Sequence, residues 1–414
     1  MNVLGIIASG VAALFITVAL AKSARRVALR PHVPNEPGGR APRAEALRRT
    51  GGATAVLGVG TATGVALWLG AADDATGSVG GLLAGAGIVA ALGLVHDLKP
   101  LRTVLRLGGQ IAAATLVVCL AGLPPVAGVL AALWIVLVTN AFALLDHADG
   151  LLTAVGLVTA AGLLTCALVG GAPALALLPT TLVAGLAGFL LHTWHPARLR
   201  LGAAGAQFTG FALAASGALI QVAAPSGRAA WAALPALATV ALADSTLVLI
   251  SRRRAARSPL RDTDDHIAHR LRRVRVTVPG AAVLTTLWAA VPVATGTLVY
   301  ADLLHPAFLL LPLAGTAAAV FALLRIPAYA PPRTAPPRTG SSRTAPSRTA
   351  AARRTQTSGV GAAIPAAASA PGAKASAPGQ GAPAARTAAG HPTVPPPPTG
   401  RPAAEAAAAA AERG

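Results

Sequence analysis

The chain has 414 residues, of which 54% are hydrophobic and 12% are charged, and its formal net charge is +20. This composition excludes an ordinary soluble domain, because the apolar residues gather in runs long enough to cross a bilayer. Only 3% of the residues are aromatic, so the basic residues lack the stacking partners of a nucleic-acid surface. The positive charge therefore indicates membrane topology and contact with anionic membrane lipids, and no nucleic acid is expected as a partner.

Apolar segments along the chain predict an all-α, polytopic integral membrane protein with about 11 transmembrane helices. Basic residues follow the first segment and none precedes it, which is opposite to a cleaved signal peptide and favours a retained helix. In chain order the predicted spans are 3–21, 53–70, 79–95, 109–123, 126–145, 151–169, 175–191, 206–223, 231–250, 276–300 and 307–324.

The loops between these spans differ in charge from one side to the other. Loops assigned to the cytoplasm carry most of the arginines, whereas those assigned outside carry Asp73, Asp74, Asp302 and only Arg228. The positive-inside rule therefore predicts a multi-pass protein of the cell membrane with its N-terminus outside and its C-terminus in the cytoplasm.

The composition changes near residue 327 and divides the chain into a transmembrane domain, 1–326, and a tail, 327–414. The tail contains repeats such as APPRT and APSRT, a PPPP run and an Ala-rich end. It has too little apolar bulk for a core, so we expect a disordered, basic cytoplasmic tail. Its arginines suit anionic lipid, and a solvated tail without a specific role is the plainer alternative.

The stretch NAFALLDHADGLLTAVG, residues 140–156, joins the fifth and sixth predicted spans. Asp146 and Asp149 are three residues apart, so on a helix they would share one face. Acidic groups at the end of a membrane span are costly unless they are paired, metal-bound or hydrated, which makes both residues functional candidates. A polar helix cap at the membrane surface is the alternative.

Most of the unusual polar residues fall on the predicted cytoplasmic side. A cytoplasmic cleft lined by carboxylates, histidines and arginines suits a divalent metal and a diphosphate substrate. Local ion pairs or a solvated helix face explain each residue separately, but the joint pattern favours a site. The residues are Asp97, Asp146, Asp149, His195, Asp244, Asp262, Asp264, Asp265, His266 and His269.

Several motifs, in order, resemble those of the polyprenyl-phosphate N-acetylhexosamine-1-phosphate transferases, which include the peptidoglycan lipid I synthase. The resemblance covers residues 3–324 and is specific because the motifs occur in the family's order. The matching segments are PNEPGGRAPRAEALRRTGG, GLVHDLKPL, NAFALLDHADGL, HPARLRLGAAGAQFTGF and LADSTLVLISRRRAARSPLRDTDDHIAHRL.

This resemblance implies transfer of an N-acetylhexosamine-1-phosphate, or of a muramoyl-pentapeptide phosphate, from a UDP-sugar to polyprenyl phosphate, with release of UMP. Asp97 would deprotonate or orient the lipid phosphate. Asp146 and Asp149 would orient the nucleotide or bind Mg²⁺. The remaining matched positions, which would bind substrate, are Asn140, His266, His269 and Arg270. Dimers occur in the family, so a homodimer is an expectation by resemblance.

The chain departs from the family pattern inside these motifs. The substituted positions are His96, Ala143, Ala203, Ala206 and Ala268. In the family an aspartate at the position of Ala203 is thought to hold the Mg²⁺, and alanine cannot ligate a cation. His96 or Asp265 would then have to complete the metal shell.

Three other functions remain open from the sequence. A catalytically degenerate family member would bind lipid or nucleotide sugar, or act as a regulatory membrane protein. The acid pairs Asp146–Asp149 and Asp262–Asp265 superficially resemble an intramembrane prenyltransferase, although such enzymes have fewer spans and longer acid-rich motifs. A transporter is disfavoured because no obvious internal repeat or symmetric broken helix is visible.

Overall fold

A computed structural model describes residues 3–28, 51–72, 75–224, 233, 235–256 and 265–328. The chain separates into two units, 1–337 and 338–414, and every described residue belongs to the first. These residues form helices and no strand, which confirms the predicted all-α class. The loop 29–50, Asp73, Asp74, Asp262, Asp264 and nearly all of the predicted tail lie outside the described residues.

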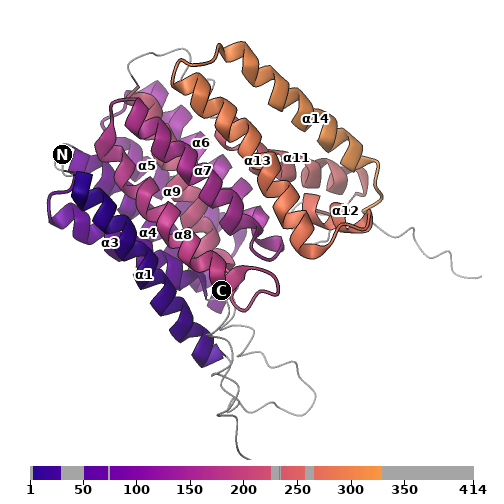
Figure 1. The fold of residues 1–414 in the computed structure, drawn as a ribbon, viewed down its shortest axis with the longest axis horizontal. Coiled ribbons are helices and arrows are strands. Elements are labelled where there is room, and N and C mark those ends of the chain that lie inside the picture. The colour runs from indigo at the N-terminus through magenta and orange to yellow at the C-terminus, as the bar shows by residue number, and fades with distance from the viewer. Residues whose placement is uncertain are drawn as a thin grey trace, which may run out of the picture. The chain divides into compact units, whose positions relative to one another are not determined.

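Within the described ranges, one long helix corresponds to each predicted span (Figure 1). The long helices are α1 (Val3–Ala28), α3 (Gly52–Trp68), α4 (Thr76–Leu98), α5 (Thr103–Leu120), α6 (Pro125–Leu144), α7 (Leu151–Val169), α8 (Leu177–Thr193), α9 (Gly202–Val222), α11 (Thr239–Arg254), α13 (Val278–Tyr300) and α14 (Leu310–Leu324). The short segments are the 3₁₀ turns η2 (Leu145–His147), η3 (Pro173–Ala176) and η4 (Pro306–Leu309), and the helix α12 (Ile267–Arg273).

Among the described residues, 9 helices are long and apolar enough to cross a membrane. Helix α3, with 17 residues, and helix α11, with 16 residues, are shorter than the roughly 20 residues of a full crossing. The outer helices α1 and α14 expose large apolar side chains, such as Phe15 and Leu311, as lipid-facing surfaces do. The protein is therefore a multi-pass membrane protein, and two of its predicted spans are short.

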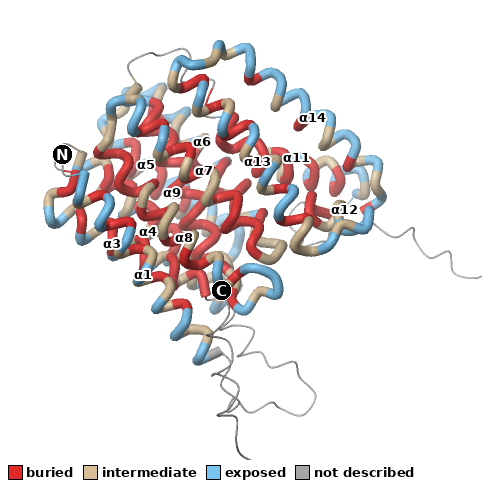
Figure 2. The backbone as a smooth tube through the Cα atoms, viewed as in Figure 1, coloured by how far each residue is buried: buried red, intermediate tan, exposed pale blue. Residues whose placement is uncertain are grey.

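Helix α9 is the centre of the described bundle. Every residue from Ala204 to Gln221 is buried, and the helix packs against α3, α4, α6 and α7. Figure 2 shows buried backbone through the middle of the bundle and exposed backbone on its outer helices. Glycine and alanine dominate the first turns of α9, and such small residues let neighbouring helices approach closely. The N-terminus of α9 is thereby held against α4.

Gly93 permits the closest approach of α4 to α9. A Cβ atom added at Gly93 would lie 2.5 Å from the carbonyl oxygen of Ala203, which is backbone and has little room to shift. We expect Gly93→Ala to lower the free energy of unfolding by about 1–3 kcal/mol through overpacking. Denaturant unfolding of the detergent-purified protein measures this change.

Gly87→Ala is the matched control on the same helix, because a Cβ atom at Gly87 meets nothing within 4 Å. The control should be neutral or slightly stabilising, since alanine favours the helix over glycine by about 1 kcal/mol. Equal effects of the two substitutions would contradict the close packing of α4 on α9.

Candidate active site

The N-terminus of α9 binds two of the predicted catalytic carboxylates. Asp97, in the last turn of α4, accepts the N–H groups of Ala203 and Ala204 at 3.0 Å each, one on each carboxylate oxygen. Asp146, in η2, lies beside the backbone amide of Gly202. The first amides of a helix have no partner within the helix and carry its positive dipole end, so they stabilise anionic groups. This end of α9 therefore brings α4 and η2 together.

Two arginines lie beside these carboxylates. Arg106 of α5 has its Nη1 atom 3.5 Å from His96 Nε2. With its amide oxygen turned toward Arg106, Gln207 accepts from Nε and Nη2 at 3.1 and 2.6 Å. Arg200 donates from Nη2 to the carbonyl oxygen of Asp146 at 2.7 Å. Guanidinium groups next to a helix N-terminus are suited to binding phosphate.

The prediction that Asp146 and Asp149 share one face of a helix is wrong. Helix α6 ends at Leu144, and Asp146 has φ −76° and ψ 22°, outside the helical range. Gly150 then adopts φ +71°, which glycine reaches without a Cβ penalty, and α7 begins after it. Because of this break, the carboxylates of Asp146 and Asp149 point toward different segments.

Asp149 accordingly contacts a different segment, the loop that follows α8. Its Oδ2 atom lies 2.9 Å from His195 Nδ1 and accepts the N–H of Ala197 at 3.2 Å. His195 was a predicted site residue, and the structure assigns it to this contact. Asp149 thus holds the loop that leads to Arg200 and to the start of α9, so it positions the neighbouring groups.

The acids of the family motifs do not assemble a Mg²⁺ site among the described residues. Asp97 and Asp149 bind backbone N–H groups, Asp146 lies beside the Gly202 amide, and Ala203 supplies no ligand atom. In the described part of the chain, one group of three histidine or acidic side chains brings its ligand atoms together, and none of these three acids belongs to it. Mg²⁺ requires about six oxygen ligands in octahedral geometry. The expected ligand set therefore does not fit, and we assign no step to this ion.

His147, His266 and His269, which follow α6 and α11 in the chain, lie close together. His147 stacks on His266 with ring centroids 4.0 Å apart, and its centroid is 5.2 Å from that of His269. Asp244 of α11 fixes the position of His266. Its Oδ2 lies 2.8 Å from His266 Nδ1, and its Oδ1 accepts the N–H of Ile267 at 2.7 Å. Because His147 follows Asp146 directly, His266 and His269 lie close to η2, as the motif pattern predicted.

Arg270, a predicted diphosphate ligand, is buried in the protein framework. Its guanidinium donates to the carbonyl oxygens of Asp265, Leu323 and Ile326 at 3.0, 2.7 and 2.7 Å. It also donates to Ser251 Oγ at 2.6 Å. These bonds tie α11, α12 and α14 together, so we leave Arg270 out of the proposed substrate contacts.

Asp265, considered above as a substitute metal ligand, is engaged in the same region. Its two oxygens accept from Arg252 Nε and Nη2 at 2.9 and 3.1 Å, and both side chains are buried. Asn140 also has a local role, because its Nδ2 donates to Gln110 Oε1 at 2.6 Å and to the Val136 carbonyl at 2.8 Å. Substrate binding by Asn140 stays a prediction.

Sequence reasoning missed Arg106, Arg200, Gln207 and His147 as site residues. The two arginines were interpreted only as topology signals, although Arg200 lies inside the motif HPARLRLGAAGA. His147 stands between the two motif acids, and that position was its only signal. Gln207 also lies inside the matched segment HPARLRLGAAGAQFTGF, which was its only signal.

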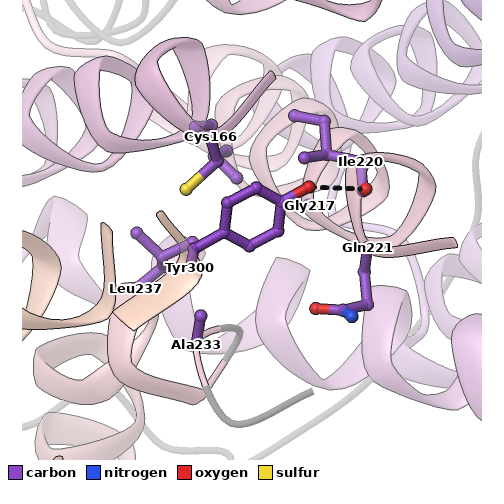
Figure 3. Close-up of a pocket in the computed structure, with 8 residues that line it drawn as sticks. Cys166, Gly217, Ile220, Gln221, Ala233, Leu237 and Tyr300 are labelled. Carbon is purple, nitrogen blue, oxygen red and sulfur yellow. Dashed lines mark hydrogen bonds between the residues drawn. The ribbon is translucent and has the colours of Figure 1, made fainter. Parts of the chain in front are cut away.

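A separate cavity between α7, α9 and α13 is not a substrate site (Figure 3). Its volume is about 10 Å³, whereas ligand pockets have roughly 300–1,000 Å³. Tyr300 closes it and donates to the Ile220 carbonyl at 3.1 Å. The lining residues are Leu163, Cys166, Gly217, Ile220, Gln221, Ala233, Leu237 and Tyr300.

Comparisons with known proteins identify a family and several relatives to which the chain is similar. A family model described as glycosyl transferase family 4 matches residues 79–221, which run from α4 to α9. A Streptomyces coelicolor protein, named as a candidate glycosyltransferase, is 42% identical over 290 residues, which are 68% of each chain. Asp97, Asp146 and the start of α9 all fall inside the family match.

Two further relatives carry more specific names. Decaprenyl-phosphate N-acetylglucosaminephosphotransferase of Mycolicibacterium smegmatis is 29% identical over 286 residues, covering 59% of this chain and 69% of its own. A Bacillus subtilis protein, named provisionally as an undecaprenyl-phosphate N-acetylglucosaminyl 1-phosphate transferase, is 34% identical over 84 residues. That match covers 20% of this chain and 24% of the relative.

Proposed function

Because the chain belongs to glycosyltransferase family 4, we propose that it transfers an N-acetylhexosamine-1-phosphate, or a muramoyl-pentapeptide phosphate, from a UDP-sugar to polyprenyl phosphate. The reaction would release UMP and serve cell-envelope glycan synthesis. Two relatives named as polyprenyl-phosphate N-acetylglucosamine phosphotransferases support the reaction class. The observation that carries the proposal is the N-terminus of α9, where Asp97 and Asp146 lie beside Arg106 and Arg200.

In the proposed reaction, a non-bridging oxygen of the lipid phosphate attacks the β-phosphorus of the UDP-sugar. The bond from this phosphorus to the bridging oxygen breaks, and UMP leaves with the electron pair. The guanidinium groups of Arg106 and Arg200 would hold phosphate oxygens in line. Asp97, fixed by two amides, keeps further lone pairs with which to orient the lipid phosphate or accept its proton. Asp146 would orient the nucleotide.

A second function is favoured by one specific observation. Ala203 lacks the expected carboxylate, and the remaining acids are bound to backbone amides. A protein of this kind would bind polyprenyl phosphate or nucleotide sugar without turnover. The assay that separates the two functions uses purified protein with Mg²⁺, polyprenyl phosphate and radiolabelled UDP-N-acetylglucosamine or UDP-N-acetylmuramoyl-pentapeptide. Lipid-linked label together with UMP establishes transfer, whereas binding in calorimetry without product establishes the second function.

Asp97→Asn is expected to lower kcat by about 10²- to 10⁴-fold, the usual contribution of a positioned proton acceptor. Asp302→Asn is the matched control, since Asp302 is exposed in the loop after α13. Thermal unfolding of both variants separates lost chemistry from lost structure. A native protein that turns over and an Asp97→Asn variant that keeps its full rate would exclude this role of Asp97.

We also propose that this site faces the cytoplasm, with the N-terminus outside and the C-terminus inside. Support comes from the concentration of arginines in the loops on the side of the α9 N-terminus. A homodimer remains a proposal from the family resemblance alone. Labelling of single cysteines introduced in opposite loops tests the orientation in intact cells.

A further inference from the structure

Three segments bring potential metal ligands to one place beside the proposed active site. His147 lies in η2, Asp244 in α11, and His266 immediately before α12. One ligand atom from each residue lies within 4.8 Å of the other two. Asp244 and His266 are 0% and 2% exposed, whereas His147 is half-buried, so the group lies at the edge of the interior.

One ring nitrogen of His147 has no hydrogen-bond partner among the described residues, which is the first indication of a bound ion. Its Nδ1 atom lies 2.8 Å from the carbonyl oxygen of Leu144, so that nitrogen must bear the proton, because a carbonyl only accepts. Nε2 therefore presents its lone pair, yet this atom is buried and has no hydrogen-bond partner among the described residues. A buried polar atom without a partner destabilises the folded state. A bound cation would satisfy it.

The surroundings of His147 match the usual support of a metal-binding histidine. Such a residue almost always donates its other ring N–H to a carbonyl or carboxylate, which fixes the tautomer and the ring orientation. The Leu144 carbonyl performs this function for His147. Asp244 is similarly fixed, because its Oδ1 accepts the Ile267 N–H at 2.7 Å while Oδ2 faces His266.

We propose that His147, Asp244 and His266 bind a divalent transition-metal ion of the Zn²⁺ type. Two imidazoles and one carboxylate form a ligand set that suits Zn²⁺, whereas Mg²⁺ prefers oxygen ligands and is not expected here. The metal would take the place of the hydrogen bond between His266 Nδ1 and Asp244 Oδ2, with the imidazole proton of His266 on Nε2. Because the rings of His147 and His266 are stacked with centroids 4.0 Å apart, one ring must turn to bring both lone pairs onto the same ion. A fourth coordination position remains for water or a phosphate oxygen.

This site would connect three parts of the bundle. It joins η2 to α11 and to the start of α12, and η2 carries Asp146 next to His147. A bound ion would therefore fix the position of Asp146 relative to α9. The proposal concerns metal binding and does not depend on the identity of the sugar or on turnover.

The test uses the full chain, without an affinity tag, purified in detergent, stripped with a chelator and titrated with Zn²⁺ or Co²⁺ alone. We expect one equivalent of bound metal, a visible Co²⁺ absorption band of histidine coordination, and a higher thermal unfolding temperature with metal. His147→Ala should weaken binding more than about 100-fold, because it removes a ligand and loss of outer partners alone costs 10–100-fold. His305→Ala, which removes an exposed cap of η4, should bind as the native protein does.

Two results would overturn the proposal. One is a native protein that binds no stoichiometric Zn²⁺ or Co²⁺ at micromolar concentration. The other is a folded His147→Ala variant that binds like the native protein, which would indicate adventitious binding elsewhere. If His147→Ala does not fold, His147→Gln and the Co²⁺ spectrum of the native protein give the decision. Because the readout is metal content, failure here leaves the transferase proposal unaffected, and the reverse also holds.

Discussion

Asp265→Ala is expected to lower the free energy of unfolding by about 3–5 kcal/mol, since it leaves the guanidinium of Arg252 buried without its carboxylate partner. The two side chains form a bidentate pair at 2.9 and 3.1 Å between α11 and the start of α12. The backbone of Asp265 also accepts from Arg270, so the substitution acts where three helices meet. Denaturant unfolding in detergent measures the loss.

Two further variants test whether the loss comes from the broken ion pair. Arg253→Ala, on the exposed side of the same helix, should change stability by less than about 0.5 kcal/mol. The double variant Arg252→Met with Asp265→Leu should recover most of the loss, because apolar residues of similar volume often replace a buried ion pair without cost. An Asp265→Ala variant as stable as the native protein would show that the pair is not buried in solution.

Ala203→Asp is expected to raise Mg²⁺-dependent turnover by about 10²-fold or more, which corresponds to roughly 3 kcal/mol of transition-state stabilisation. The new carboxylate would stand in the first turn of α9, beside Asp97, whose Oδ1 binds the N–H of residue 203. It would supply the ligand that the described residues lack. The radiolabel assay with polyprenyl phosphate measures the change, and omission of Mg²⁺ should abolish the gain.

Ala203→Asn is the matched control, since it has nearly the same shape as the aspartate and no charge. It should leave the native rate unchanged. A native protein that is silent while Ala203→Asp is active would identify an intact scaffold that has lost its metal ligand. An active native protein that gains nothing from Ala203→Asp would contradict the expectation and would indicate catalysis organised by Arg106 and Arg200.

The succession of apolar segments long enough to cross a membrane made the order of the helices predictable. Each predicted span has its helix in the described ranges, because a run of about 20 apolar residues has one stable arrangement in lipid. Length was less predictable: α3 and α11 are shorter than a full crossing.

The candidate site was predictable in its motif acids and histidines, but not in its arginines or in the role of each residue. Motif order identified Asp97, Asp146, His266 and His269, and the structure places the two acids beside the start of α9 and the two histidines beside His147 of η2. Arg270 carried the same motif signal, yet it binds backbone carbonyls from α14, more than 50 positions away in the chain. A sequence motif cannot distinguish a phosphate ligand from a framework arginine, since both roles require a guanidinium at a fixed position.

The sequence by itself determined the all-α membrane class, the order of the helices and the family, because each depends on local composition or on motif order. Only the tertiary structure decided where each acid points. The break at Asp146 and the left-handed Gly150 send Asp146 to the first amide of α9 and Asp149 to the loop at His195. The tertiary structure also stacks the ring of His147 on that of His266. These outcomes depend on contacts between segments far apart in the chain, where backbone donors and packing select the partner of each side chain.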